Sequence, residues 1–277
     1  METLSPPVPF RFQSLASGSS GNCYLLQAGT DTVLIDCGIG IRQITAACNN
    51  WGANDRNLTA VVITHEHGDH VRSLDAIRRR GAPILATHGT ANALRLGSDH
   101  YTRLVHLEPR QIGGLEIVPV PTSHDAAEPT GILIRVANVT IGIITDLGEV
   151  NDQVTELAQM CDLLVLESNH DRDMLRMGPY PAHLKRRVAG KHGHLSNDQA
   201  AGLIGEIVTA SAGPSEIWLG HLSATNNTPT VALETTVSRL RKGNLMVPVT
   251  VLPRGGVGPT WSGSVPRHRQ LQLMAEM

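Results

Sequence analysis

Aromatic residues are scarce in this chain of 277 residues, which has two Phe, three Trp and three Tyr. Few rings are therefore available on which unpaired bases could stack. The formal net charge is −2, so the chain as a whole has no general attraction for a polyanion. Composition alone gives no indication of a protein that acts on nucleic acid.

Long apolar runs and closely spaced cysteines are also missing. The hydrophobic stretches are short and end in polar residues, which argues against a membrane span. The first residues contain neither a basic segment nor an apolar core of the kind that directs export, so we expect a cytoplasmic protein. The four cysteines lack CxxC spacing, and we expect them to be buried, reduced thiols.

Short β-branched runs alternate with segments of helical periodicity in both halves of the chain. This alternation predicts an α/β (α+β) architecture, with two mixed β-sheets packed face to face and helices outside. No linker interrupts the pattern, so we expect one domain over residues 10–253, with Val247–Leu252 as its last strand. The remaining residues, 254–277, are rich in Gly, Pro and Ser and are expected to be poorly ordered.

The most informative stretch of the sequence is 59–70. An apolar run, Ala60–Ile63, is typical of a buried strand, and four polar groups follow it within six residues: His65, His67, Asp69 and His70. Imidazole nitrogens and carboxylate oxygens are ligands that borderline divalent metals prefer, and Gly68 lets the chain turn tightly among them. His65 and His67 precede the turn at Gly68 and would face one position, whereas Asp69 and His70 follow the turn and would face another. We therefore predict two adjacent metal ions.

Two ions need about eight ligand contacts if each takes four, which is more than this motif supplies. Other expected strands also end in polar groups, at Asp36, near His124, at Asp146 and at His221. We expect Asp146 to bridge the ions and His124 and His221 to complete the ligand sets, although Asp146 taken alone could simply cap a helix. Asp36 is expected to accept a hydrogen bond from a ligand histidine.

A second informative segment is 190–197. Its glycines let the backbone approach a ligand closely, and Ser196 begins an expected helix whose N-terminus can receive an anion. His194 is placed to protonate a leaving oxygen, or is a loop residue without a role. Lys185 belongs to a basic run that would supply positive charge for phosphates, although a solvated helix face explains this run equally well.

Three residues of the Gly- and Ser-rich turn at 17–22 are candidate substrate contacts: Ser19, Ser20 and Asn22. A simple turn explains them equally well. We expect His88, His100, His106, His192 and His268 to have no functional role.

The HxHxDH pattern at 65–70, the preceding Leu34–Gly38 and the later His, Asp and His resemble the metallo-β-lactamase fold. Four further strings are similar to the WalJ/YycJ-type branch, cytoplasmic bacterial proteins linked to phosphodiester cleavage in DNA: Ala16–Tyr24, Leu166–Asp171, Gly193–Asn197 and Leu219–Ser223. The resemblance implies an αβ/βα sandwich that holds two divalent metal ions, zinc or manganese.

Similarity to ribonuclease Z-like relatives implies the ligand sets. One ion would be held by His65, His67, His124 and Asp146, and the other by Asp69, His70, Asp146 and His221. The same relatives imply that His194 assists the leaving group, and we count Asp69 with it among the catalytic residues.

The resulting hypothesis is a metal-dependent phosphodiesterase acting on nucleic acid, foremost a 5′ to 3′ DNA exonuclease linked to repair. A hydroxide made available by two ions would attack phosphorus in line while His194 protonates the departing oxygen. Two alternatives stay open: a metallo-hydrolase of a small ester, thioester or cyclic phosphodiester, and a non-catalytic regulatory protein with a structural metal site.

Overall fold

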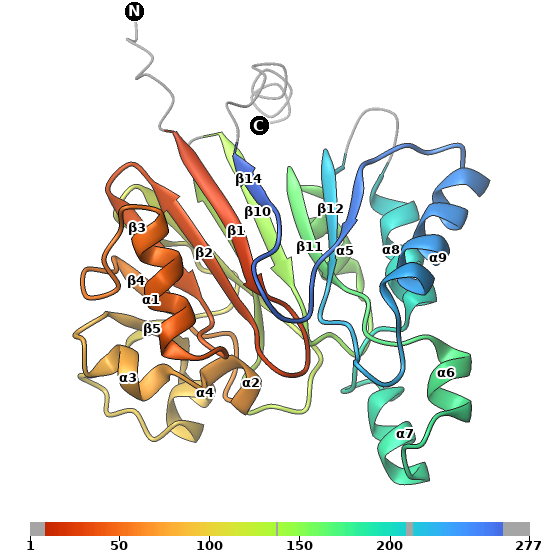
Figure 1. Ribbon diagram of the computed structural model, residues 1–277, viewed down its shortest axis with the longest axis horizontal. Helices are drawn as coiled ribbons and strands as arrows, with labels where there is room; N and C mark the ends of the chain where they lie inside the picture. Colours follow the sequence, from red (N-terminus) through yellow and green to blue (C-terminus); the bar gives the residue numbers. More distant parts are fainter. Residues whose placement is uncertain (1–8, 137, 209–212, 263–277) are drawn as a thin grey trace, which may run out of the picture.

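The computed structural model of the chain describes residues 9–136, 138–208 and 213–262. Within these residues, two seven-stranded β-sheets pack face to face, and helices cover their outer faces (Figure 1). This four-layer αβ/βα sandwich confirms the architecture predicted from the alternation of strands and helices. No helix of the described residues is long and apolar enough to cross a membrane.

The first sheet is antiparallel on one side and parallel on the other. Its strands, in spatial order, are β14 (Thr260–Ser262), β1 (Phe10–Ala16), β2 (Cys23–Ala28), β3 (Asp31–Ile35), β4 (Ala60–Val62), β5 (Ile84–Thr87) and β6 (Thr102–Leu104). Strands β3 to β6 are parallel, because helices carry the chain back between them. The helices on this side are α1 (Ile41–Asn50), α2 (Gly68–Val71), α3 (Leu74–Arg78) and α4 (His88–Ala93).

The second sheet has the order β13 (Val249–Val251), β12 (Glu216–Gly220), β11 (Leu163–Glu167), β10 (Val139–Ile144), β9 (Thr130–Val136), β8 (Leu115–Pro121) and β7 (Arg110–Ile112). Strands β10 to β13 are parallel, and the rest form an antiparallel meander. Its outer face packs on α5 (Asp152–Gln159), α8 (Asn197–Ile207) and α9 (Pro229–Lys242). Two short helices lie beyond one end of the sheet, α6 (Arg172–Met177) and α7 (Ala182–Val188) (Figure 1).

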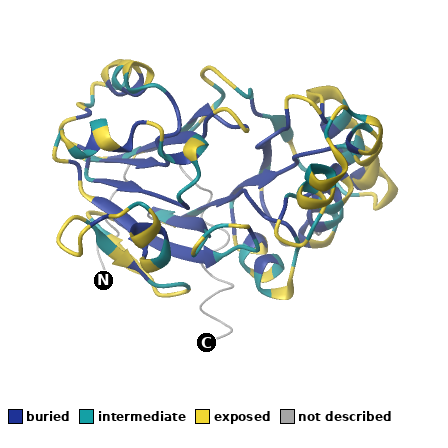
Figure 2. Cartoon of the chain, turned by 90° about the horizontal axis from the view of Figure 1, so that it is seen from below, coloured by how far each residue is buried: buried dark blue, intermediate teal, exposed yellow. Residues whose placement is uncertain are grey.

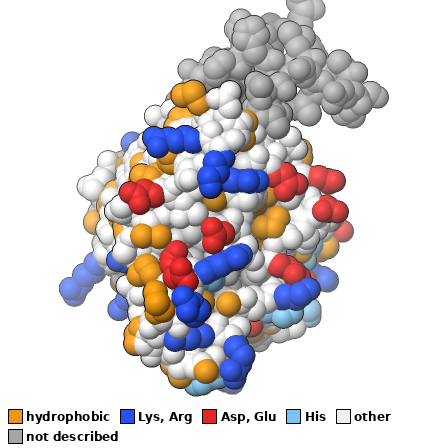
Figure 3. Space-filling view, turned by 90° about the vertical axis from the view of Figure 1, so that its right-hand side faces the viewer, with side chains coloured by type: hydrophobic (Ala, Val, Ile, Leu, Met, Phe, Trp, Pro, Cys, Tyr) orange, Lys and Arg blue, Asp and Glu red, His pale blue; other side chains and the backbone are white. Residues whose placement is uncertain are grey.

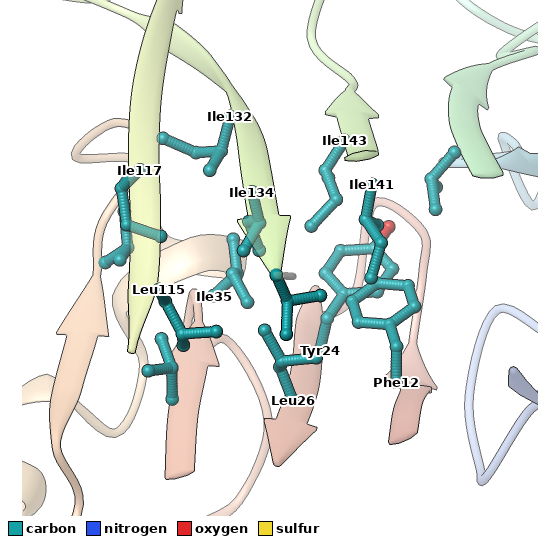
Figure 4. Close-up of a cluster of buried hydrophobic side chains, with 14 of the residues drawn as sticks. Phe12, Tyr24, Leu26, Ile35, Leu115, Ile117, Ile132, Ile134, Ile141 and Ile143 are labelled. Carbon is teal, nitrogen blue, oxygen red and sulfur yellow. The ribbon is translucent and has the colours of Figure 1, made fainter. Parts of the chain in front are cut away.

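The central core lies between the sheets, where strands of both are dark in the burial view (Figure 2). Phe12 stacks between Tyr24 and Trp218, with ring centroids 5.8 and 5.6 Å apart. Ile141 and Ile143 of β10 lie near the rings of Phe12 and Tyr24 from the opposite sheet (Figure 4). Burial of each such side chain contributes roughly 1.5–3 kcal/mol to the free energy of folding. These buried aromatic rings therefore stabilise the packing of the two sheets.

Strands β7 and β8 form a hairpin that turns at Gly113, with a φ of 58°. The structure corrects the predicted end of the domain. The strand at 249–251 is not the last, because Thr260–Ser262 pairs with Arg11–Gln13 as β14 and extends the first sheet past residue 253. The rest of the predicted tail, 263–277, lies outside the described residues.

Candidate metal centre

Polar side chains gather at one edge of the sandwich because each follows the carboxyl end of a strand. Asp36 follows β3, His65 comes soon after β4, Asp146 comes soon after β10, and His221 follows β12. Carboxyl ends of parallel strands meet at the same edge of a sheet, and the two sheets contribute two groups each. Ligand atoms of His65 and Asp146 lie within 4.8 Å of each other, and Asp146 Oδ1 lies 3.6 Å from Nδ1 of His221.

Three of these residues have left-handed backbone, with φ of 57° at Asp36, 56° at Asp146 and 54° at His221. Non-glycine residues rarely adopt such values, and each costs on the order of 1–3 kcal/mol. Residues strained in this way cluster where the fold must point a side chain at a functional site. Asp146 and His221 thus point from the ends of their strands into the candidate centre, and Asp36 points to Nδ1 of His70.

The turn that carries Asp69 and His70 is fixed by backbone contacts from two other loops. The carbonyl oxygen of Asp69 accepts from Asn22 N at 2.8 Å, and that of His70 accepts from Cys37 N at 2.8 Å. Gly38 packs so closely that a Cβ there would lie 1.6 Å from the Asp69 carbonyl oxygen. Only glycine fits at this position, so the loop after β3 and the HxHxDH turn are held as a unit.

The imidazole and carboxylate groups form two adjacent sets. Ligand atoms of His65, His67 and His124 all lie within 4.8 Å of one another, and so do those of a second set: Asp69, His70 and His221. Asp146 lies between the sets, with Oδ1 3.7 Å from Nε2 of His124 and Oδ2 3.3 Å from Nε2 of His70. That Asp146 bridges two ions stays a prediction.

The unpartnered atoms at this centre fit a bound cation. Nε2 of His65 and Oδ2 of Asp146 are buried, and neither has a hydrogen-bond partner among the described residues. Buried polar atoms are seldom left without a partner, since each costs about 1–3 kcal/mol. The donor set is nitrogen and oxygen only, which suits zinc, manganese and iron alike.

The histidines are oriented by hydrogen bonds from their other ring nitrogen. Nδ1 of His70 donates to Oδ2 of Asp36 at 2.7 Å, and Nδ1 of His124 donates to the carbonyl oxygen of Gly193 at 3.0 Å. Each bond leaves Nε2 facing the centre, as in proteins whose histidines bind metal. Asp36 therefore lies where the sequence analysis expected it, behind a candidate ligand.

A cavity of about 170 Å³ adjoins this centre. His194 lines it, and the side chain of His194 is 21% exposed. The other lining residues include Ser19, Asn169, Tyr180 and Arg187. The cavity therefore lies between the candidate metal ligands and the end of α7.

The sequence matches the β-lactamase superfamily domain over residues 31–217. The chain belongs to this superfamily. This metallo-β-lactamase-fold hydrolase is 34% identical to exodeoxyribonuclease YycJ of Bacillus anthracis over 224 residues, which is 78% of this chain and 83% of YycJ. It is 31% identical to exodeoxyribonuclease WalJ of Streptococcus pneumoniae over 252 residues, 87% of this chain and 92% of WalJ.

Solved structures give the same fold. The metallo-β-lactamase fold protein YhfI from Bacillus subtilis superposes with a TM-score of 0.70 at 18% identity, covering 92% of this chain and 100% of YhfI. At this identity the likeness concerns the fold alone. The resemblance inferred from the HxHxDH motif is thus confirmed by both sequence and structure.

The electrostatics of this hydrolase divide its histidines into two kinds. Burial lowers the pKa of His65 and of His124, which keeps both rings neutral. Burial also acts to lower the pKa of His70, but the charges of Asp146 and Asp36 outweigh it and raise the pKa to about 10. The pKa of His221 is raised in the same way, chiefly by Asp146.

Glu167 is the residue that sequence reasoning missed. It is fully buried at the end of β11, and its Oε1 accepts from Nδ1 of His194 at 2.8 Å and from Nδ1 of His221 at 2.7 Å. Its other oxygen accepts from the backbone N–H groups of Leu147 and Leu195, each at 3.0 Å. The signal was present, because β11 ends in an acidic residue just as the neighbouring strands end in ligands.

Asn22 and the serines of the 17–22 turn were predicted to contact substrate, and the structure separates them. Ser19 lines the cavity, whereas Ser20 is exposed and is not among the lining residues. Asn22 is buried, with Nδ2 3.3 Å from Oδ2 of Asp69 and 3.0 Å from Nε2 of His70. Asn22 therefore contacts the candidate ligand atoms of Asp69 and His70 directly and does not line the cavity.

Ser196 and Lys185 are not brought to the cavity. Ser196 caps α8 as predicted, but its hydroxyl is buried and donates to Oε1 of Gln199 at 2.8 Å, so it is not available to an anion. Lys185 lies on the side of α7 turned away from His194, and its Nζ donates to the carbonyl oxygen of Arg176 at 2.8 Å. In the same basic run, Arg187 is the residue that reaches the cavity.

Proposed function

We propose that this protein is a metal-dependent phosphodiesterase that cleaves nucleic acid, with DNA as its substrate and 5′ to 3′ exonuclease action linked to repair. The observation that carries the proposal is that His194 lies beside the two sets of candidate metal ligands. His194 is hydrogen-bonded to Glu167 and lines the adjoining cavity. The relatives named exodeoxyribonuclease, which the chain matches over most of their length, support DNA as the substrate. We also propose a cytoplasmic location, in keeping with a DNA substrate.

The candidate ligands would hold two divalent ions, zinc or manganese. His65, His67 and His124 would bind one, Asp69, His70 and His221 the other, and Asp146 both. When bound, such ions lower the pKa of water and neutralise phosphate charge.

The chain's own groups then position the strand and handle the proton. Arg187 and Ser19 line the cavity and are placed to contact the phosphodiester. His194, with Nδ1 held by Glu167, would donate a proton from Nε2 to the departing oxygen. The buried carboxylate of Glu167 stabilises the protonated ring until that transfer.

The test uses 5′- and 3′-end-labelled single- and double-stranded DNA and RNA oligonucleotides, incubated with purified protein and Mn²⁺ or Zn²⁺. We expect DNA to be shortened from its 5′ end, with no shortening by His67→Ala purified in the same way, which controls for a contaminating nuclease. If every oligonucleotide stays intact while a cyclic phosphodiester or a thioester is hydrolysed, the small-molecule alternative is correct. If nothing is hydrolysed by metal-loaded protein, the site is structural and the proposal is wrong.

A further inference from the structure

Helix α7 separates two cavities. One face of the helix lines the cavity that contains His194, with Leu184, Arg187 and Val188. The other face lines a second cavity of about 420 Å³, with Lys185, Arg186 and Ala189. Residues three and four apart share a face of a helix. The basic run Lys185–Arg187 therefore contributes side chains to both cavities.

The second cavity, here termed the α6/α7 pocket, is strongly cationic. Eight residues line it, and four of them carry positive charge while none is acidic: His170, Arg172, Leu175, Arg176, Lys185, Arg186, Ala189 and Gln199. The space-filling view shows Lys and Arg side chains gathered at this lower end of the molecule (Figure 3).

The acids beside the pocket leave much of its charge uncompensated. Asp173 pairs with Arg176 at 3.0 Å, and Asp198 approaches Arg172 at 3.5 Å, both on the exposed surface. Arg186 has no acidic partner within 4 Å among the described residues, and Lys185 is bonded only to a carbonyl oxygen. Arg172, Arg176 and Arg186 are exposed, and together with the half-buried Lys185 they line one hollow.

His170 is an independent sign that the pocket receives a polar ligand. It is 2% exposed although it lines the pocket, and its Nδ1 has no hydrogen-bond partner in the part of the chain that the structure describes. Its backbone is fixed, because its carbonyl oxygen accepts from Asn197 N at 2.8 Å. An imidazole that is buried and held in this way, in a pocket lined by four cations, is suited to hydrogen-bond an anion.

The same short segment connects the pocket to the candidate metal centre. Glu167 orients His194 and His221, Asn169 lines the first cavity, and His170 lines the pocket. The two cavities therefore lie on either side of α7, close to one strand end. A chain of phosphates that crosses α7 passes both.

We propose that the α6/α7 pocket binds a backbone phosphate of the same nucleic-acid strand whose scissile phosphate lies at the metal centre. This inference rests on the proposed nuclease function and adds to it a second phosphate site, remote from the reacting bond. Guanidinium groups suit this role because their planar fork matches two phosphate oxygens. The site holds the strand in register and takes no part in the chemical step.

The test compares two double variants with the same loss of charge. Arg176→Ala/Arg186→Ala removes two exposed cations of the pocket, and Arg241→Ala/Lys242→Ala removes two exposed cations of α9 that do not line it. Each metal-loaded protein is assayed on single-stranded DNA oligonucleotides over a range of salt concentrations. Bis(p-nitrophenyl) phosphate, which is too short to reach from the metal centre across α7, is the second substrate.

We expect the pocket variant to raise KM for the oligonucleotide about tenfold. The slope of log affinity against log salt should become shallower by about 0.7 for each phosphate that the variant no longer neutralises. Hydrolysis of bis(p-nitrophenyl) phosphate should stay within about twofold of wild type, since weaker phosphate binding leaves the chemical step unchanged. Equal KM and equal salt slope for the two double variants would overturn the inference alone. Wild-type protein that cleaves no oligonucleotide would instead overturn the proposed function, and the inference with it.

Discussion

Glu167 and His194 are joined by a hydrogen bond of 2.8 Å in which Nδ1 of the imidazole donates to Oε1 of the carboxylate. The same oxygen accepts from Nδ1 of His221 at 2.7 Å, so one buried acid orients a candidate proton donor and a candidate metal ligand together. Burial acts to raise the pKa of Glu167, but the charge of His194 and the two hydrogen bonds outweigh it and bring the pKa to about 2. Burial is likewise outweighed at His194, where the charge of Glu167 raises the pKa.

Replacing Glu167 with Gln keeps the shape of the side chain and removes its charge. We expect turnover to fall about 10–100-fold, the usual effect of losing a group that orients metal-binding histidines. The pKa of His194 should fall as well, so the alkaline limb of the pH–rate profile moves to lower pH. The measurement is kcat against pH with metal content determined in parallel, and exposed Glu206→Gln on α8 is the control. A profile identical to wild type would refute the orienting role.

His194→Ala separates proton donation from metal binding. We expect DNA cleavage to fall about 10²–10⁴-fold, the usual contribution of a general acid. A p-nitrophenyl phosphodiester should lose far less, because p-nitrophenolate departs without a proton. Metal content should equal that of wild type, measured by elemental analysis after dialysis.

The matched control for that variant is His192→Ala, two residues away and exposed. It should behave as wild type with both substrates. Because His194 also lies in a group with Asp146, Glu167 and His221 that could hold a cation, loss of metal from His194→Ala would reassign it as a ligand.

His67→Ala tests the first ligand set with least harm to the fold, because His67 is only partly buried. We expect metal content to fall and DNA cleavage to drop to the level of wild-type protein treated with a chelator. Circular dichroism and the Tm in chelator should match those of metal-free wild type, since the side chain leaves no core cavity. The exposed His100→Ala is the control. Full activity of His67→Ala in metal-depleted buffer would contradict the proposed mechanism.

The parts of this site that the sequence predicted are those set by local pattern. A buried strand that runs directly into HxHxDH is typical of a metal site, and the strand-end rule then located Asp146 and His221. Glu167 also stands at a strand end, but that position does not distinguish an acid that binds metal from one that orients histidines. Its role depends on two histidines that are 27 and 54 residues away.

The substrate contacts were harder to predict for a different reason. Lys185 and Arg187 belong to one basic run, and only the packing of α7 decides which of them faces the cavity. Ser196 satisfied the sequence signature of a helix cap, yet capping uses the hydroxyl that an anion would need. Periodicity gives the face of a helix but not the neighbour against which that face packs.

Metal-free protein should lose stability as the pH rises above neutrality. Asp146 and Asp36 raise the pKa of His70 to about 10 against the effect of burial, whereas an unfolded histidine titrates near about 6.5. The protonated ring therefore stabilises the fold fully below about pH 6.5, and this contribution is lost as the pH rises through about 10. We expect the Tm of chelator-treated protein to fall between pH 7 and pH 10 by more than the Tm of metal-loaded protein, in which His70 must already be neutral.

Metal binding should also release protons, because the raised pKa of His70 keeps its ring protonated in the metal-free protein. At pH 8 the ring of His70, with its pKa of about 10, carries a proton that a cation must displace, and the raised pKa of His221 favours a second, whereas His65 and His124 are neutral and release none. Titration calorimetry in buffers of different ionisation enthalpy measures the number released, which we expect to be at least one. Asp36→Asn lowers the pKa of His70 and should reduce both the proton release and the alkaline loss of Tm. A release of zero at pH 8, with metal bound, would mean that these two histidines do not face the cation.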